Sequence, residues 1–229
     1  MIPERIECGD FVLRRWRQAD AEPFWAAIEE SRDHLRPFMP WADAQTLDGV
    51  RVTLGRFERE WDQGGDMVLG MFAGMTVVGA CGLHRRLGPD GLEIGYWVHA
   101  AHTRRGYASR AARALTTAAF ALPWVRREEI KHDRANVASE GVPRKLGFNL
   151  VGVERREPRA PAETGDFRVW RMTRDHWSAP ALTGPGGRGP VASGAAPGRT
   201  ASRRPAEPGT RENDAGATPA SSAPQGDRV

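Results

Sequence analysis

The chain has 229 residues, of which 33 are basic and 29 acidic, and its formal net charge is +4. This length allows one ordinary domain with a sizeable core, and we expect one domain. The charges are interspersed rather than gathered into a stripe, which argues against nucleic acid as a partner and is equally compatible with a polyanionic ligand.

The cysteines and the N-terminal residues indicate a reducing compartment. Cys8 and Cys81 lie far apart without a C-x-x-C spacing, which argues against a zinc site or a disulfide framework. Acidic Glu4, Glu7 and Asp10 stand where a signal peptide would be apolar, and no run approaches 18 apolar residues. We therefore expect a cytoplasmic protein without a membrane partner.

The N-terminal half reads as one strand, two helices and an antiparallel meander. Alternation predicts a first strand over Phe11–Leu13, and Asp20 is a plausible N-cap for the first helix. Turn signals at 73–74 and 88–91 separate the later strands. The predicted helices span 20–32 and 46–62, and the predicted meander strands span 67–72, 76–84 and 92–98.

The C-terminal half alternates strands and helices. Alanines and leucines recur at i, i+3, i+4 spacing over 106–122, which predicts a helix whose small residues allow close packing on a sheet. A strand over 128–134, a helix over 137–146 ended by Gly147, and strands over 149–156 and 166–173 follow. The order predicts an α/β domain with a mixed, mostly antiparallel central sheet flanked by helices.

Composition changes sharply after Trp177. Between Ala179 and Val229 the only large aliphatic residues are Leu182, Val191 and Val229, among 8 Pro and 9 Gly. Such a segment cannot bury enough apolar surface to offset its ordering entropy. We therefore predict a folded domain over 1–177 and a disordered Pro/Gly/Ala-rich tail over 178–229.

The turn before the alanine-rich helix is the most informative segment. A strand enters it and the helix leaves it, so the backbone amides from Arg104 to Ser109 point to one place at the positive end of the helix dipole. Gly106 permits close backbone approach, and Arg104, Arg105 and Arg110 add positive charge. The pattern favours a pyrophosphate-binding cradle, although the arginines alone would also fit an ordinary basic helix start.

Two motifs in this order resemble those of the GNAT superfamily of N-acetyltransferases. Thr103–Ala108 (TRRGYA) resembles the acyl-CoA-binding motif Arg/Gln-x-x-Gly-x-Gly/Ala, with Thr103 departing from the usual first residue. Asn136–Phe148 resembles the Asn-x-x-Ser helix that ends in Leu-Gly-Phe. The resemblance covers about Phe11 to Thr173. It implies a GNAT-like domain that uses acetyl-CoA as cosubstrate and no metal, bound through Arg104, Arg105, Gly106, Tyr107, Ala108 and Ser109.

Acetyl transfer to an amine needs a base, a polarised carbonyl and a partner for the departing thiolate. Glu93 is the candidate base, and a solvated carboxylate at the strand end is the alternative. The resemblance implies that an amide near Trp97 or Val98 polarises the thioester carbonyl and that Asn136 contacts the pantetheine arm. It further implies that Ser139 protonates or hydrogen-bonds the thiolate. The alternative is that Asn136 and Ser139 have only a structural role, as an N-cap and a surface residue of a helix.

The acceptor is open at this level. Asp33–Trp41 resembles a loop of the Rim-type branch, which acetylates ribosomal-protein N-termini, so a protein α-amine is one candidate acceptor. Small-molecule amines such as aminoglycosides are another, and a non-catalytic acyl-CoA sensor is the alternative to an enzyme. His99 and His102 lack a third ligand for a metal site. Monomer and homodimer are both compatible with the sequence.

Overall fold

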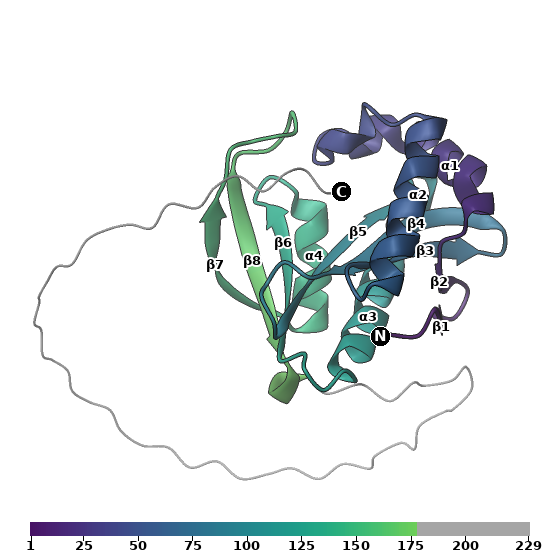
Figure 1. The fold of residues 1–229 in the computed structure, drawn as a ribbon. Helices are drawn as coiled ribbons and strands as arrows, with labels where there is room; N and C mark the ends of the chain where they lie inside the picture. Colours follow the sequence, from purple (N-terminus) through teal and green to yellow (C-terminus); the bar gives the residue numbers. More distant parts are fainter. Residues whose placement is uncertain (178–229) are drawn as a thin grey trace, which may run out of the picture. The chain divides into compact units, whose positions relative to one another are not determined.

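The computed structural model describes residues 1–177, which form one eight-stranded sheet with four α-helices (Figure 1). The predicted tail over 178–229 lies outside the described residues. The strands run in the order β1-β2-β3-β4-β5-β6-β8-β7 across the sheet. Their bounds are β1 Arg5–Glu7, β2 Val12–Arg15, β3 Met67–Ala73, β4 Thr76–His84, β5 Gly91–Val98, β6 Arg127–Asp133, β7 Asn149–Arg155 and β8 Asp166–Thr173.

The sheet is antiparallel except between β5 and β6, which confirms the predicted mixed and mostly antiparallel sheet. The parallel pairing begins at Gly91 opposite Arg127 and ends at Ile94 opposite Ile130. Both strands continue beyond that point, β5 to Val98 and β6 to Asp133. The centre of the sheet is therefore split at the carboxyl ends of these two strands.

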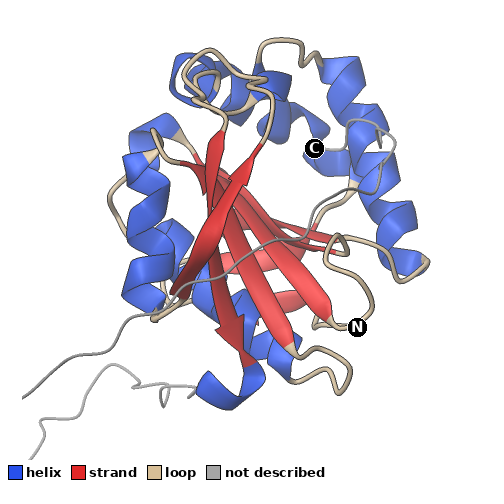
Figure 2. Cartoon of the chain, turned by 90° about the vertical axis from the view of Figure 1, so that its left-hand side faces the viewer, coloured by secondary structure: helices blue, strands red, loops and turns tan. Residues whose placement is uncertain are grey.

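The helices cover both faces of the sheet (Figure 2). They are α1 Ala21–Leu35, α2 Leu47–Asp62, α3 Tyr107–Phe120 and α4 Val137–Leu146. One buried cluster joins α1 and α2 to one face and includes Trp97. A second cluster joins α3 and α4 to the opposite face and includes Leu92 and Ile94, with Tyr96 packed against it. Alternating residues of β5 thus face different helices.

The small residues of α3 account for its close packing on the sheet. Ala111, Ala112, Leu115 and Ala119 are fully buried, as their helical spacing predicts. Beneath them, β4 is buried along almost its whole length, as expected for a central strand. This packing fixes the start of α3 relative to the carboxyl end of β5.

The structure corrects three details at the N-terminal end. β1 was not predicted, because three mostly exposed residues carry no clear alternation. α1 extends to Leu35, so the predicted loop over 33–41 begins with helical residues. Asp20 stands at the N-cap of α1, but its side chain accepts hydrogen bonds from Arg14 and from the backbone N–H of Arg17 rather than from the helix.

Candidate active site

The first turn of α3 presents backbone amides that no side chain caps. Gly106 is the N-cap residue, adopts the left-handed conformation with φ of 78°, and has no side chain to accept from the turn. The N–H groups of Tyr107, Ala108 and Ser109 belong to the first helical turn, which has no intrahelical acceptors. Apart from Gly106, its chain neighbours and the backbone of its own helix, no protein atom lies within 4 Å of the position that a Cβ of Gly106 would take. The turn thus has the geometry of an anion-binding cradle.

The cationic side chains at this turn are not equivalent. Arg104 has a φ of 58° and is the one non-glycine among residues 1–177 in the left-handed region. Arg104 and Arg105 are exposed beside the uncapped amides. Arg110 instead forms an ion pair with Asp10 and donates to the carbonyl oxygen of Cys8. Its charge ties the N-terminal segment to α3, which leaves Arg104 and Arg105 as the cations for phosphate groups.

Two other residues of the motif act locally. The hydroxyl of Thr103 donates to the carbonyl oxygen of Ala100 at 3.2 Å and closes the short 3-10 turn Ala100–His102. The ring of Tyr107 is buried edge-on against Phe11 at 5.0 Å between centroids. Only the backbone of Tyr107 is therefore placed to contact a ligand in the cradle.

The amides at the end of β5 point in alternating directions. The N–H of His99 donates to Val78 of β4, so the N–H of Trp97 also points to β4 and that of Val98 points to the side of β6. A Cβ at Gly79 would collide with the carbonyl oxygen of Trp97, which confirms that this edge of Trp97 faces β4. Between the two sequence candidates, Val98 is the one whose amide faces the split beyond Ile94.

The part of Trp97 that bears on the site is its side chain, because its amide points to β4. The indole is buried in the cluster of α1 and α2, 6.2 Å from both the Phe24 and the Trp41 ring centroids. Trp41 lies in the 3-10 turn Pro40–Ala42 of the α1–α2 loop. This loop is therefore attached by aromatic contacts to the same strand end that carries the Val98 amide.

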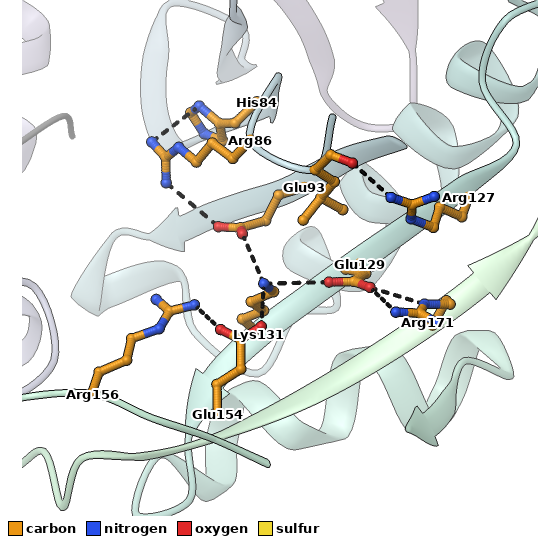
Figure 3. Close-up of polar contacts among 10 residues, drawn as sticks. His84, Arg86, Glu93, Arg127, Glu129, Lys131, Glu154, Arg156 and Arg171 are labelled. Atoms are coloured by element: carbon orange, nitrogen blue, oxygen red, sulfur yellow. Dashed lines mark hydrogen bonds and ion pairs between the residues drawn. The ribbon is translucent and has the colours of Figure 1, made fainter. Parts of the chain in front are cut away.

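Glu93 lies inside a network of charged side chains on the face that Trp97 shares (Figure 3). Its carboxylate is 3.4 Å from Arg86 and 3.8 Å from Lys131. The ammonium of Lys131 also contacts Glu129 at 3.3 Å and Glu154 at 2.7 Å. Only 14% of the Glu93 side chain and 10% of the Lys131 side chain are exposed. Glu93 is thus a largely buried carboxylate with two cationic partners. It is not the solvated carboxylate at a strand end that the sequence left as the alternative.

Asn136 and Ser139 meet at the start of α4. The side-chain oxygen of Asn136 accepts from the backbone N–H of Ser139 at 3.1 Å, as an N-cap does. This leaves the amide nitrogen of Asn136 as the donor for any ligand. The hydroxyl of Ser139 lies 2.9 Å from the hydroxyl of Tyr96 on β5.

Sequence reasoning missed Tyr96. The motif around Asn136 pointed to Ser139 alone, whereas Tyr96 lies on β5, far from α4 in sequence. The alternation of β5 would have placed Tyr96 on the face away from Glu93, but nothing local identifies Ser139 as its partner. Glu93 and Ser139 are accordingly not in contact; they lie on opposite faces of the sheet, on either side of the split.

The α1–α2 loop and the β7–β8 connection meet. The backbone N–H of Ala162 in the β7–β8 connection donates to the carbonyl oxygen of Pro37 at 3.0 Å. We expect both segments to contact the acceptor, because the α1–α2 loop carries Trp41, which packs on Trp97. The contact brings them together beside the face that carries Trp97.

His99 has hydrogen-bond partners, and the ring of His102 lies edge-on against the rings of His99 and Tyr107. The N–H of Ala101 donates to Nδ1 of His99, so Nε2 carries the hydrogen and donates to Glu30 at 3.1 Å. Burial, with His99 and Arg105 nearby, lowers the pKa of His102. Within residues 1–177, no three His, Cys, Asp or Glu side chains are grouped so that they could hold a metal ion. Over the same residues, no helix is long and apolar enough to cross a membrane.

With this geometry established, sequence comparison gives the class of protein. The family described as Acetyltransferase (GNAT) domain matches residues 10–149. The chain therefore belongs to the GNAT acetyltransferase family, and the predicted acyltransferase activity is confirmed. A search of curated proteins finds no match.

Solved structures share the fold. The microcin C7 self-immunity acetyltransferase MccE, in complex with acetyl-CoA and AMP, has 17% identity and a TM-score of 0.69, covering 75% of this chain and 97% of MccE. RimL, a ribosomal L7/L12 α-N-protein acetyltransferase in complex with coenzyme A, has 19% identity and a TM-score of 0.69, covering 74% and 98%. RimJ of Mycobacterium smegmatis, in complex with a CoA disulfide, has 21% identity and a TM-score of 0.67, covering 75% and 85%.

Proposed function

We propose that this enzyme transfers the acetyl group of acetyl-CoA to a primary amine, namely the N-terminal α-amine of a protein. The observation that carries the cosubstrate assignment is the uncapped first turn of α3, which lies next to the split between β5 and β6. Amide donors, the helix dipole and two exposed arginines suit a pyrophosphate group. A thioester arm that starts at this turn would extend toward the split beside Val98.

Glu93 is the proposed base. An α-amine with a pKa of about 8 is mostly protonated at neutral pH, so it must lose a proton before it attacks. Arg86 and Lys131 keep the Glu93 carboxylate in a fixed position. Glu93 shares a sheet face with Trp97, whereas the cradle at α3 and Ser139 lie toward the opposite face. An acceptor and acetyl-CoA would thus approach the split from opposite faces.

The amide of Val98 is the proposed donor to the thioester carbonyl. Negative charge accumulates on that oxygen as the amine attacks, and a fixed amide stabilises it without reorganisation; one such donor contributes about 3 kcal/mol in other enzymes. The departing thiolate would then accept a hydrogen bond from Ser139. Asn136 would contact the pantetheine arm through its amide nitrogen.

A protein N-terminus is favoured as acceptor by the resemblance of the α1–α2 loop to that of Rim-type enzymes and by the structural likeness to RimL and RimJ. The likeness to MccE, which was solved with AMP, supports a small-molecule amine as the second candidate. A protein N-terminus continues as a polypeptide chain, whereas a small amine does not. The two acceptors therefore differ in how far they would extend past the Pro37–Ala162 contact.

The test is acetyl-CoA-dependent thiol release by the full chain against peptides with free N-termini, the same peptides with blocked N-termini, aminoglycosides and polyamines. Release with free N-termini alone supports the proposal. Release with small amines alone selects the second candidate. Acetyl-CoA binding without release from any acceptor would indicate a sensor and contradict the proposed transfer.

Glu93→Gln tests the base, with Glu154→Gln as its matched control. Both carboxylates contact Lys131, but Glu154 lies on edge strand β7. We expect Glu93→Gln to lower turnover by about 100-fold, within the range of general-base contributions, and most severely at low pH, where the amine is protonated. The Glu154 variant should stay within about twofold. Equal losses in both variants would assign Glu93 to the network alone.

A further inference from the structure

Tyr96 is a second hydroxyl at the proposed thiolate site. It projects from β5 toward α4, where its oxygen lies 2.9 Å from Oγ of Ser139 and 3.2 Å from the carbonyl oxygen of the same residue. One tyrosine hydroxyl thus contacts both polar groups that Ser139 offers. The contact joins β5 to α4 through two residues that are 43 positions apart in sequence.

Pro143 explains why the Ser139 carbonyl is available. In a regular helix this oxygen accepts from the N–H four residues later, but proline has no N–H to donate. Pro143 occupies that position inside α4. The Tyr96 hydroxyl supplies the donor that the helix lacks. A hydrogen bond from a β5 side chain thus replaces the one that is missing within α4.

Counting hydrogens leaves two arrangements of this pair. A carbonyl only accepts, so if Tyr96 donates to it, the Ser139 hydroxyl donates to the tyrosine oxygen. If Tyr96 instead donates to Oγ, the hydrogen of Ser139 is released to point at another acceptor. A small rotation of two hydroxyl hydrogens therefore changes Ser139 from an occupied donor to an available one, while the heavy atoms stay in place.

We propose that Tyr96 is a positioning residue for Ser139 in acetyl transfer: by donating to Oγ it aims the serine hydrogen at the departing thiolate. The inference rests on the proposed function and adds a residue to its site. The thiolate is stabilised by a hydrogen bond, and no proton is taken from tyrosine.

The proton balance supports a hydrogen bond over proton transfer. Burial raises the pKa of Tyr96 above its ordinary value of 10, whereas a thiol ionises near 8.5. The thiolate is therefore too weak a base to deprotonate Tyr96. As the C–N bond forms and the C–S bond breaks, the amine nitrogen loses a proton to Glu93 or solvent, and the sulfur gains one from solvent.

The test compares Tyr96→Phe, Ser139→Ala and the double variant in acetyl-CoA-dependent thiol release. We expect each single change to lower kcat about tenfold and to change the KM for acetyl-CoA less than threefold. The double variant should be no slower than the slower single variant, because both remove one unit. The pH profile of Tyr96→Phe should keep the shape of the wild-type profile, because Tyr96 is not the proton donor.

Pro143→Ala separates positioning from helix capping. The alanine restores an N–H for the Ser139 carbonyl, so the melting-temperature loss of Tyr96→Phe should largely vanish in this background. The kcat loss should persist, because Oγ still lacks its donor. Recovery of kcat together with stability would overturn the inference, as would additive single effects or loss of one limb of the pH profile in Tyr96→Phe.

The same assay separates the two proposals. A wild-type chain that releases thiol while Tyr96→Phe is unimpaired overturns the inference alone. A wild-type chain that binds acetyl-CoA but releases no thiol with any acceptor overturns the proposed function and this inference with it.

Discussion

Glu128 is the residue whose chemistry is most at odds with its surroundings. It lies on β6 and faces α3 with no exposed surface, and its carboxyl oxygens have no hydrogen-bond partner among the described residues. Burial raises its pKa to about 8 from an ordinary value of 4.5, against a smaller opposing effect of Thr116. The carboxyl is thus neutral at pH 7 in the folded protein.

This pKa shift predicts a pH-dependent stability. Between about pH 4.5 and 8 the folded state retains a proton that the unfolded state has released, so stability falls as the pH rises. Glu128→Leu should remove a cost of about 3 kcal/mol at pH 7, less a smaller packing penalty. Urea unfolding at pH 5 and pH 8 checks this.

Glu128→Gln is the control for shape. It should flatten the pH dependence across this window without the gain in apolar burial. A wild-type protein that is equally stable, relative to Glu128→Gln, at pH 5 and pH 8 would contradict the shifted pKa.

The left-handed conformation of Gly106 determines where α3 begins. Gly106→Val adds a Cβ to a left-handed residue and places it in the open space beside the first-turn amides. We expect the Kd for acetyl-CoA to rise at least about tenfold, or about 1.4 kcal/mol, as measured by calorimetry.

Gly106→Asn controls for backbone strain in this prediction. Asparagine tolerates the left-handed region better than valine does, so its melting temperature should stay near wild type. Its extra atoms still approach the cradle, and its Kd should also rise. Unchanged affinity in the asparagine variant would mean that the phosphates bind elsewhere.

At the scale of elements, periodicity predicted most of the fold. The bounds of α4 and of β4 agree with the predicted ranges 137–146 and 76–84, because each segment combines a clear apolar pattern with an adjacent turn signal. β1 escaped prediction because an exposed strand of three residues has no buried face to produce a pattern.

The network around Lys131 could not be predicted in the same way. Its members come from β5, β6 and β7, and their contacts depend on the order in which β8 inserts between β6 and β7. Sequence patterns set which face a side chain occupies, but not which distant strand lies beside it. Tyr96 and Ser139 are a second case of the same limit.

Replacing Lys131 measures how much this network contributes to the free energy of unfolding. Lys131→Met leaves Glu93, Glu129 and Glu154 together without their shared cation. Leaving a buried charge without any partner costs about 3 kcal/mol. Because Arg86, Arg171 and Arg156 still contact these carboxylates, urea unfolding at pH 7 should show a smaller loss, of about 1.5 kcal/mol.

A variant that keeps the charge tests the electrostatic origin of that loss. Lys131→Arg should lose less than half as much, because it keeps the charge. An equal loss in Lys131→Arg and Lys131→Met would indicate a packing defect instead.

At the scale of the molecule, residues 1–177 contain both buried clusters that the structure describes. The two buried clusters contain residues from Ile2 to Met172, and Trp177 packs against one of them. The backbone N–H of Trp177 donates to the carbonyl oxygen of Thr173. The solved structures above are covered almost completely by about three quarters of this chain. The domain boundary that composition predicts at Trp177 stays a prediction.

A chain that ends at Trp177 should therefore keep its stability and its activity. No residue assigned here to the core or to the candidate site lies beyond that position, so the melting temperature should stay within about 2 °C and kcat/KM within about twofold of the full chain; a 1 kcal/mol loss would shift the melting temperature by about 3 °C. Calorimetry and thiol release provide the measurements. A loss of turnover at unchanged melting temperature would give residues 178–229 a part in acceptor binding, whereas a loss of both would place the domain boundary further along the chain.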